Sequence, residues 1–270
     1  MTSPLNRGCF VSLPKRHRES FYGLEERFIM PCLDKLKETP RRELLVFYVL
    51  DTSASMYGTA IAQLNRAVEE SIEALKECAK NNGDVRLKIA VLEFNSNCKW
   101  INPNEPELLE TDFMWQDLEV SLESSEIAVA LRELNSKLSR NAFLKSMTGT
   151  LMPVIIFMTD GNFTDDYEEE LAKIRENKCF KHATKIGFVI GENPDEEMIV
   201  EIVGNSEAVL HTLDMGLFKK LIPYYDINFT IHPSARLYSK TVAGRDILQD
   251  VIKELNFLKM MTGIRNGDKL

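Results

Sequence analysis

Short apolar runs alternate with longer stretches of helical spacing throughout the middle of the chain. Five runs have the length and composition of buried strands, and they cover residues 44–50, 85–94, 152–158, 184–190 and 208–212. Between them, apolar residues recur every three or four positions over 61–79 and 127–138, as on one face of a helix. Strands without polar alternation are covered on both faces, which is typical of parallel sheets. The order of these segments predicts an α/β fold, a doubly wound and mostly parallel sheet flanked by helices.

The chain changes character on both sides of this region. Residues 1–41 contain a basic cluster at 15–18, and we interpret them as an N-terminal extension. Residues 223–270 form a C-terminal extension with one amphipathic helix, whose apolar residues align between 247 and 258. We expect this helix to pack on its own chain. The predicted α/β domain therefore occupies residues 42–222.

Charge and composition exclude several classes of protein. The chain has 33 Lys and Arg against 41 Asp and Glu, a formal net charge of −8, so the basic stripe that neutralises nucleic-acid phosphates is not expected. No apolar run approaches the roughly 18 residues of a membrane helix, and the first residues lack the pattern of a secretory signal. The five cysteines are scattered without metal-binding or redox spacing, which favours free thiols in a reducing compartment. We therefore expect a cytoplasmic protein that binds neither nucleic acid nor membrane.

Oxygen-bearing side chains follow two of the predicted strands. Asp51, Ser53 and Ser55 come after the first strand, and Asp160 comes after the third. Ligands of open parallel sheets gather beyond the carboxyl ends of the strands, so these side chains are expected at one edge. Oxygen ligands suit a hard cation, Mg²⁺ or Mn²⁺. Because serine hydroxyls are neutral, such an ion would still attract a further carboxylate, supplied by a protein partner.

This arrangement resembles the von Willebrand factor A (vWA) domain and its metal-ion-dependent adhesion site (MIDAS). The family motif Asp-x-Ser-x-Ser matches Asp51, Ser53 and Ser55, and the later Asp of the family matches Asp160. The resemblance implies a Rossmann-like fold and a non-enzymatic, metal-dependent interaction module.

The resemblance also implies one more hydroxyl ligand, a distant threonine in the family. The family writes Gly-Thr-x-Leu-Gly-x-Ala-Leu, and alignment on Ala130 and Leu131 puts Ser125 in the threonine position. Ser124 is the alternative.

A narrower resemblance links residues 50–58 and 159–166 to the TerY group of intracellular bacterial vWA proteins. That group writes Thr-Asp-Gly-x-Pro-Thr-Asp, and here Phe163 stands in place of the proline. The likeness covers residues 42–222. It implies a scaffold or regulator in a tellurium-resistance or stress system, with a protein kinase or phosphatase as partner.

Other interpretations of the same residues stay open. A metal-dependent phosphohydrolase could use Asp51 as its nucleophile, but Ser53 stands where such an enzyme needs a second Asp. The four histidines have no paired spacing and no glycine-rich phosphate loop is present, so we expect no enzymatic activity. The chain could also be a structural subunit with a silent metal site. Finally, Asp51, Ser53 and Ser55 could merely cap a helix or form a turn.

More acidic residues lie downstream of Asp160. Asp165, Asp166 and the glutamates at 168–170 are predicted to form the acidic first turn of a helix, which the helix dipole favours.

Overall fold

The computed structural model describes residues 41–81, 85–109, 113–145, 149–191 and 193–211. The basic cluster and the C-terminal amphipathic helix lie outside the described residues, so both extensions stay predictions. None of the described helices combines the length and the hydropathy that a membrane-spanning segment needs.

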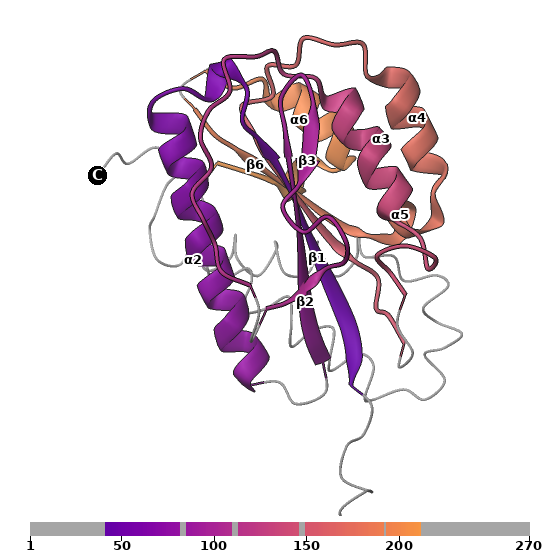
Figure 1. Ribbon diagram of the computed structural model, residues 1–270. Coiled ribbons are helices and arrows are strands. Elements are labelled where there is room, and N and C mark those ends of the chain that lie inside the picture. The colour runs from indigo at the N-terminus through magenta and orange to yellow at the C-terminus, as the bar shows by residue number, and fades with distance from the viewer. Residues whose placement is uncertain (1–40, 82–84, 110–112, 146–148, 192, 212–270) are drawn as a thin grey trace, which may run out of the picture. The chain divides into compact units, whose positions relative to one another are not determined.

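A mixed and mostly parallel sheet forms the centre of the described region (Figure 1). Its strands run in the order β3-β2-β1-β5-β6-β7, and β4 also pairs with β2. Strands β1, β2, β5, β6 and β7 pair in parallel, whereas β3 and β4 run antiparallel to β2. The bounds are β1 Arg42–Asp51, β2 Val85–Phe94, β3 Cys98–Trp100, β4 Glu107–Leu108, β5 Val154–Thr159, β6 Thr184–Val189 and β7 Val209–Leu210.

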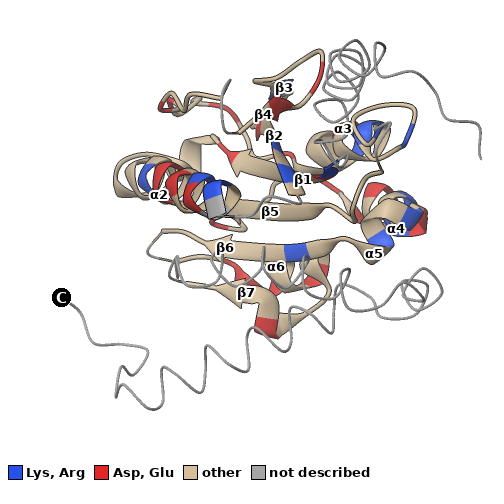
Figure 2. Cartoon of the chain, turned by 90° about the horizontal axis from the view of Figure 1, so that it is seen from below, with Lys and Arg blue, Asp and Glu red and all other residues tan. Residues whose placement is uncertain are grey.

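Helices cover both faces of this sheet (Figure 2). Helix α2 lies on one face, and α3 and α4 lie on the other. Helix α6 packs against β6 and β7. The helical bounds are α2 Thr59–Asn81, α3 Ile127–Lys137, α4 Glu168–Glu176, α5 Lys178–His182 and α6 Glu196–Val203, with 3-10 turns η3 Ala54–Met56 and η4 Ser206–Ala208. The predicted α/β architecture is therefore confirmed.

Strand β1 is the middle of the core. Residues 44–51 are all buried, because the strand has a neighbour on each side and helices above and below. On one face, Phe47 packs against Trp100 and Phe143 with ring centroids 6.1 and 6.4 Å away. On α2, the Ser71 hydroxyl donates to the Val68 carbonyl and accepts the buried Tyr48 hydroxyl at 2.7 Å. These contacts hold β1 in place and so position Asp51, the last residue of the strand.

Two short strands, β3 and β4, were not predicted from the sequence. They contain three and two residues, too few to show an alternating pattern, and they exist because the edge of β2 offers backbone partners. Because both strands run antiparallel to β2, the chain runs back along the edge of β2 before it reaches α3.

The register of the parallel strands brings their carboxyl ends to one edge, which we call the carboxyl edge. Leu50 of β1 pairs with Met158 of β5, and Thr159 pairs with Val189 of β6. The residues after β1 and β5 therefore meet there, at the top of Figure 1.

Candidate metal centre

Asp51 is the last residue of β1 and is fully buried. One carboxylate oxygen, Oδ1, accepts a hydrogen bond of 2.9 Å from the backbone N–H of Ser53. The other, Oδ2, accepts from the hydroxyls of Ser125 at 3.0 Å and Thr159 at 2.6 Å. Two segments far away in sequence, at Ser125 and Thr159, thus converge on the carboxylate that ends β1.

The two serines of the Asp-x-Ser-x-Ser motif lie beside each other. Their hydroxyl oxygens are 3.1 Å apart, with Ser53 buried and Ser55 exposed to solvent. Ser53 precedes η3 in an extended conformation, yet its side chain makes no capping hydrogen bond. The helix-cap interpretation therefore does not account for the Ser53 hydroxyl.

The structure distinguishes between the two candidates for the third hydroxyl. Ser125 is buried against Asp51, as described above. Ser124 is exposed, and its hydroxyl donates to the carboxylate of Glu126 at 3.1 Å. Of these two serines, Ser125 is therefore the one whose hydroxyl lies beside Asp51.

Asp160 lies directly after β5 and is also buried. Its Oδ1 accepts from the backbone N–H of Asn162 at 3.0 Å, and its carbonyl accepts from the N–H of Asp195 at 2.8 Å. The turn requires Gly161, whose φ is +75° and whose added Cβ would overlap the Asp195 carbonyl oxygen. The glycine thus allows the loop before α6 to press against the turn that holds Asp160.

Electrostatics at the site favour a bound cation. Burial raises the pKa of Asp51, hydrogen bonds from Ser53 and Thr159 oppose this effect, and the nearby charge of Asp160 adds to it. Among the described residues, no Lys, Arg or His forms an ion pair with either carboxylate. Buried charges need a partner, and a divalent cation would provide one. The donor set of two carboxylates and three hydroxyls suits such an ion.

Hydroxyl ligands are essential to this interpretation. Within the described ranges, no group of three Asp, Glu, His or Cys side chains is placed to hold a metal. An ion at the carboxyl edge would therefore depend on Ser53, Ser55 and Ser125 in addition to Asp51 and Asp160. Their role as ligands stays a prediction.

Sequence reasoning did not assign a role to Thr159, although its hydroxyl makes a short hydrogen bond to Asp51. The strand register contains the signal. Because Leu50 pairs with Met158, the following residues, Asp51 and Thr159, lie side by side. Thr159 could therefore be placed beside Asp51 from the sequence only if the pairing of the two strands were already known.

The role of Asp165 differs from the prediction. Helix α4 begins at Glu168, so the glutamates at 168–170 form its first turn as predicted, but Asp165 and Asp166 precede the helix. The Asp165 carboxylate accepts instead from the first two backbone N–H groups of α3, those of Ile127 at 3.1 Å and Ala128 at 2.7 Å. No sequence pattern indicates this contact, because it joins segments about forty residues apart.

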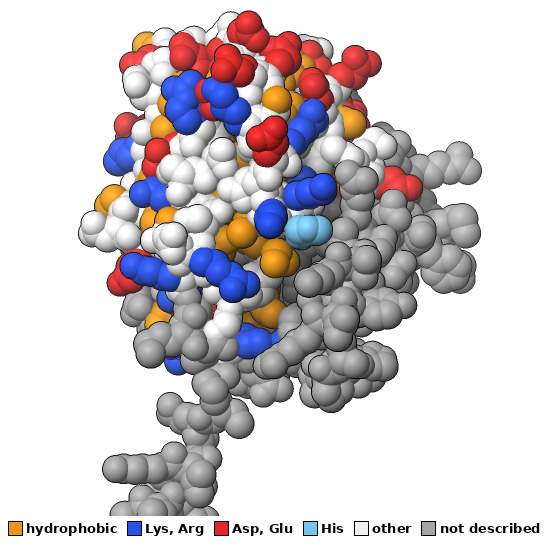
Figure 3. Space-filling view, turned by 90° about the vertical axis from the view of Figure 1, so that its right-hand side faces the viewer, with side chains coloured by type: hydrophobic (Ala, Val, Ile, Leu, Met, Phe, Trp, Pro, Cys, Tyr) orange, Lys and Arg blue, Asp and Glu red, His pale blue; other side chains and the backbone are white. Residues whose placement is uncertain are grey.

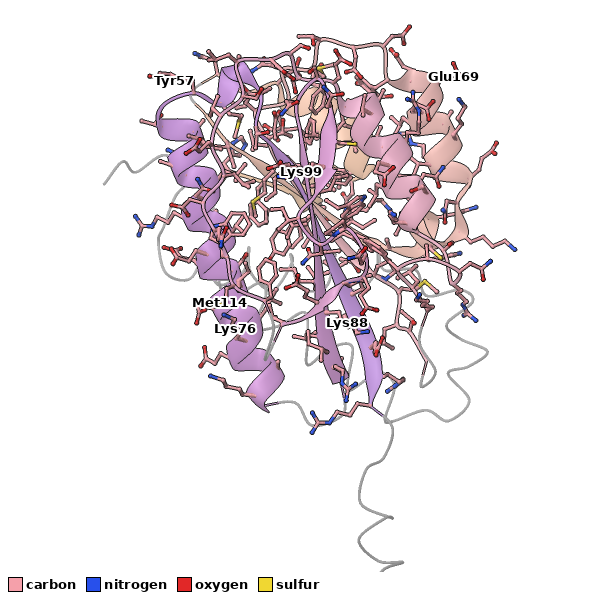
Figure 4. All side chains as sticks on the ribbon, in the orientation of Figure 1. Tyr57, Lys76, Lys88, Lys99, Met114 and Glu169 are labelled. Carbon is pink, nitrogen blue, oxygen red and sulfur yellow. The ribbon has the colours of Figure 1, made fainter. Side chains whose placement is uncertain are left out.

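The surface around the site is acidic. Residues 51–60, 121–130 and 159–170 contain nine Asp and Glu and no Lys or Arg. Figure 3 shows acidic side chains gathered along this end of the molecule. Two apolar side chains are also exposed in these segments, Tyr57 at 77% and Leu122 at 85%. In Figure 4, Tyr57 and Glu169 both lie at the carboxyl edge.

Comparison with known proteins gives distant structural likenesses. No protein-family model matches the chain, and no curated protein matches its sequence. An aerotolerance-related membrane protein from Bacteroides fragilis is 12% identical, with 67% of this chain and 98% of that chain covered and a TM-score of 0.42. Proximal thread matrix protein 1 of the mussel byssus, solved with zinc in its MIDAS motif, is 16% identical over 68% of this chain and 47% of its own, with a TM-score of 0.46. The ArnB paralog VWA2 of Sulfolobus acidocaldarius is 12% identical over 67% and 44%, with a TM-score of 0.43.

Proposed function

We propose that residues 42–222 form a vWA-type interaction module whose MIDAS-like site binds Mg²⁺, with Mn²⁺ as a substitute. The ligands would be Asp51, Ser53, Ser55, Ser125 and Asp160, and a carboxylate of a protein partner would complete the coordination. The observation that carries this proposal is the buried Asp51 carboxylate, which accepts two hydroxyl hydrogen bonds near Asp160 without a basic partner.

The chemistry of the donors supports binding in preference to hydrolysis. When bound, the ion would supply a centre of positive charge that neutral hydroxyls do not cancel. Asp51 is fully buried, and Ser53 stands where a phosphohydrolase needs a second Asp, so the site lacks an exposed carboxylate pair for attack on a phosphoryl group. The phosphohydrolase interpretation thus gains no support from the geometry.

The acidic surface around the site limits which proteins could bind there. A lone carboxylate approaching the carboxyl edge would meet the negative charge of its surface residues, Glu123, Asp166, Glu168 and Glu169 among them. Like charges across an interface are unfavourable, whereas complementary ones accelerate association. We therefore propose a partner whose metal-binding Asp or Glu is surrounded by Lys and Arg.

The biological setting is proposed from the motif alone. The sequence Thr159-Asp160-Gly161 and the residues that follow it resemble the TerY group. On that basis we propose a cytoplasmic scaffold or regulator in a bacterial stress or tellurium-resistance system, with a kinase or phosphatase of the same system as partner.

Titration with Mn²⁺, followed by the loss of its free EPR signal, tests the metal site directly. Wild type is expected to bind one ion saturably. Ser125→Ala should weaken binding roughly tenfold or more, because it removes a ligand, whereas Ser124→Ala should bind like wild type. No saturable binding by the wild type would overturn the proposal.

A second experiment tests the interaction. A partner captured on the immobilised chain in MgCl₂ should be released by EDTA and should not be captured by Asp160→Ala. EDTA is expected to leave the circular dichroism spectrum largely unchanged, since the strands do not depend on the ion. Capture that is equal with Asp160→Ala would instead support a structural subunit with a silent site.

A further inference from the structure

Helix α3 follows Ser125 almost immediately, and its N-terminus lacks a cap of its own. The N-cap residue, Glu126, makes no side-chain capping hydrogen bond. The first backbone N–H groups of a helix have no partner within the helix and need an acceptor. Here the acceptor is Asp165, which comes from the loop between β5 and α4 and binds the N–H groups of Ile127 and Ala128 with one oxygen each.

The same loop also holds the backbone of Ser125 itself. The Ser125 carbonyl accepts two hydrogen bonds from Thr164, one from its N–H at 2.8 Å and one from its hydroxyl at 3.0 Å. Thr164 and Asp165 therefore make four hydrogen bonds to residues 125–128. We call these two residues the clamp.

The clamp joins two of the segments that meet at Asp51. Asp160 and the clamp belong to one loop, and Ser125 lies at the start of the segment that the clamp holds. The Ser125 side chain must reach Asp51 Oδ2 across 3.0 Å, and a backbone free to move would not keep it there. Groups that orient a ligand typically change metal affinity by about 10- to 100-fold when removed.

We propose that Asp165 is a positioning residue of the metal centre, which fixes Ser125 by capping α3 without itself contacting the ion. The inference rests on the proposed function. Both oxygens of Asp165 are engaged by backbone N–H groups, so its effect would act through Ser125.

Asp166 provides a matched control. It is the next residue in the same loop and is exposed, whereas Asp165 is half-buried. Asp165→Ala and Asp166→Ala each remove one negative charge from nearly the same place. A purely electrostatic contribution to cation binding would therefore be similar in the two variants, whereas a capping contribution would appear in only one.

The test is Mn²⁺ titration of the full chain and its variants. Asp165→Ala should weaken binding about tenfold or more, and Asp166→Ala should stay within about twofold of wild type. Asp165→Asn keeps one acceptor oxygen, so its affinity should fall between those of wild type and Asp165→Ala. The Mn²⁺ affinity of Asp165→Asn also tests the proposal if Asp165→Ala does not fold.

A double-mutant cycle separates positioning from general destabilisation. If Asp165 acts through Ser125, Asp165→Ala should cost little further affinity in a Ser125→Ala background. Hydrogen exchange of the Ile127 and Ala128 amides should accelerate in Asp165→Ala, which reports on the cap without any metal.

The outcomes are distinct. Wild-type binding that is undiminished in Asp165→Ala and Asp165→Asn, or equal losses in the Asp165 and Asp166 variants, would overturn the positioning role alone. Losses that multiply fully in the double mutant would also overturn it. If wild type binds no Mn²⁺, the proposed function fails and this inference fails with it.

Discussion

Replacing Asp51 by Asn should stabilise the metal-free protein while it abolishes metal binding. The carboxylate is buried, close to Asp160, and its pKa is raised by burial, so its ionised form is unfavourable without a cation. Asparagine has nearly the same shape. Its carbonyl oxygen can accept from the Ser53 N–H, and the hydroxyls of Ser125 and Thr159 can turn to accept from its amide.

The size of the effect follows from the charge removed. Relief of desolvation and of like-charge repulsion should stabilise the apo protein by about 1 kcal/mol, a common value when a strained functional site is relaxed. In a domain of this size, that corresponds to an increase in Tm of about 2–4 °C. Wild type should regain the advantage with metal, since Mg²⁺ at 100 times its dissociation constant adds about 2.7 kcal/mol.

The pH dependence has a definite sign. Because the folded pKa of Asp51 lies above its unfolded value, ionisation of this group costs stability as pH rises through the folded pKa. Below the ordinary carboxyl pKa of about 4, Asp51 is protonated in both states, so wild type and Asp51→Asn should be equally stable. Their difference should open as pH rises toward neutrality.

Thermal unfolding in EDTA and in MgCl₂, at about pH 3 and at pH 7.5, tests this reasoning. Asp51→Asn should unfold above wild type in EDTA at pH 7.5 and should not respond to Mg²⁺. The reasoning would be refuted if Asp51→Asn were less stable than wild type in EDTA at pH 7.5. An equal gain from Mg²⁺ in both proteins would show that the ion binds elsewhere.

Three other outcomes are expected. Gly161→Ala should cost about 3 kcal/mol in urea unfolding, because its Cβ would overlap the Asp195 carbonyl and its φ is positive; a loss below about 1 kcal/mol would show that the two loops separate easily. Asn65→Ala should cost about 1–3 kcal/mol in the same assay, since the side chain bonds both the N–H and the carbonyl of Leu118; a neutral result would mean that solvent replaces both bonds. Partner association should slow steeply between low and physiological salt in stopped-flow measurements, because the carboxyl edge is acidic; a rate independent of salt would contradict a basic partner.

The sequence predicted the fold where the physical pattern is local. Apolar runs predict the five parallel strands, and apolar residues at every third or fourth position predict helices α2 and α3. Each of these patterns lies within about twenty residues. Strands β3 and β4 do not, because their existence depends on the edge of β2, which lies outside their own sequence.

The site divides in the same way. Asp51, Ser53, Ser55 and Asp160 could be proposed from strand ends and a motif. Thr159 and Asp165 could not, since their contacts depend on strand register and on how two loops meet. Choosing between Ser124 and Ser125 likewise required the three-dimensional position of each hydroxyl.

The hydrogen bonds to Asp51 span large distances along the chain, 74 residues to Ser125 and 108 residues to Thr159. Such contacts form only after much of the sheet has assembled, because long loops must close first. A cation would thus find no binding site in the unfolded ensemble or in early folding intermediates. We expect Mg²⁺ to leave the refolding rate nearly unchanged and to slow unfolding. Its stabilising effect would therefore be kinetic and would act only on the folded protein.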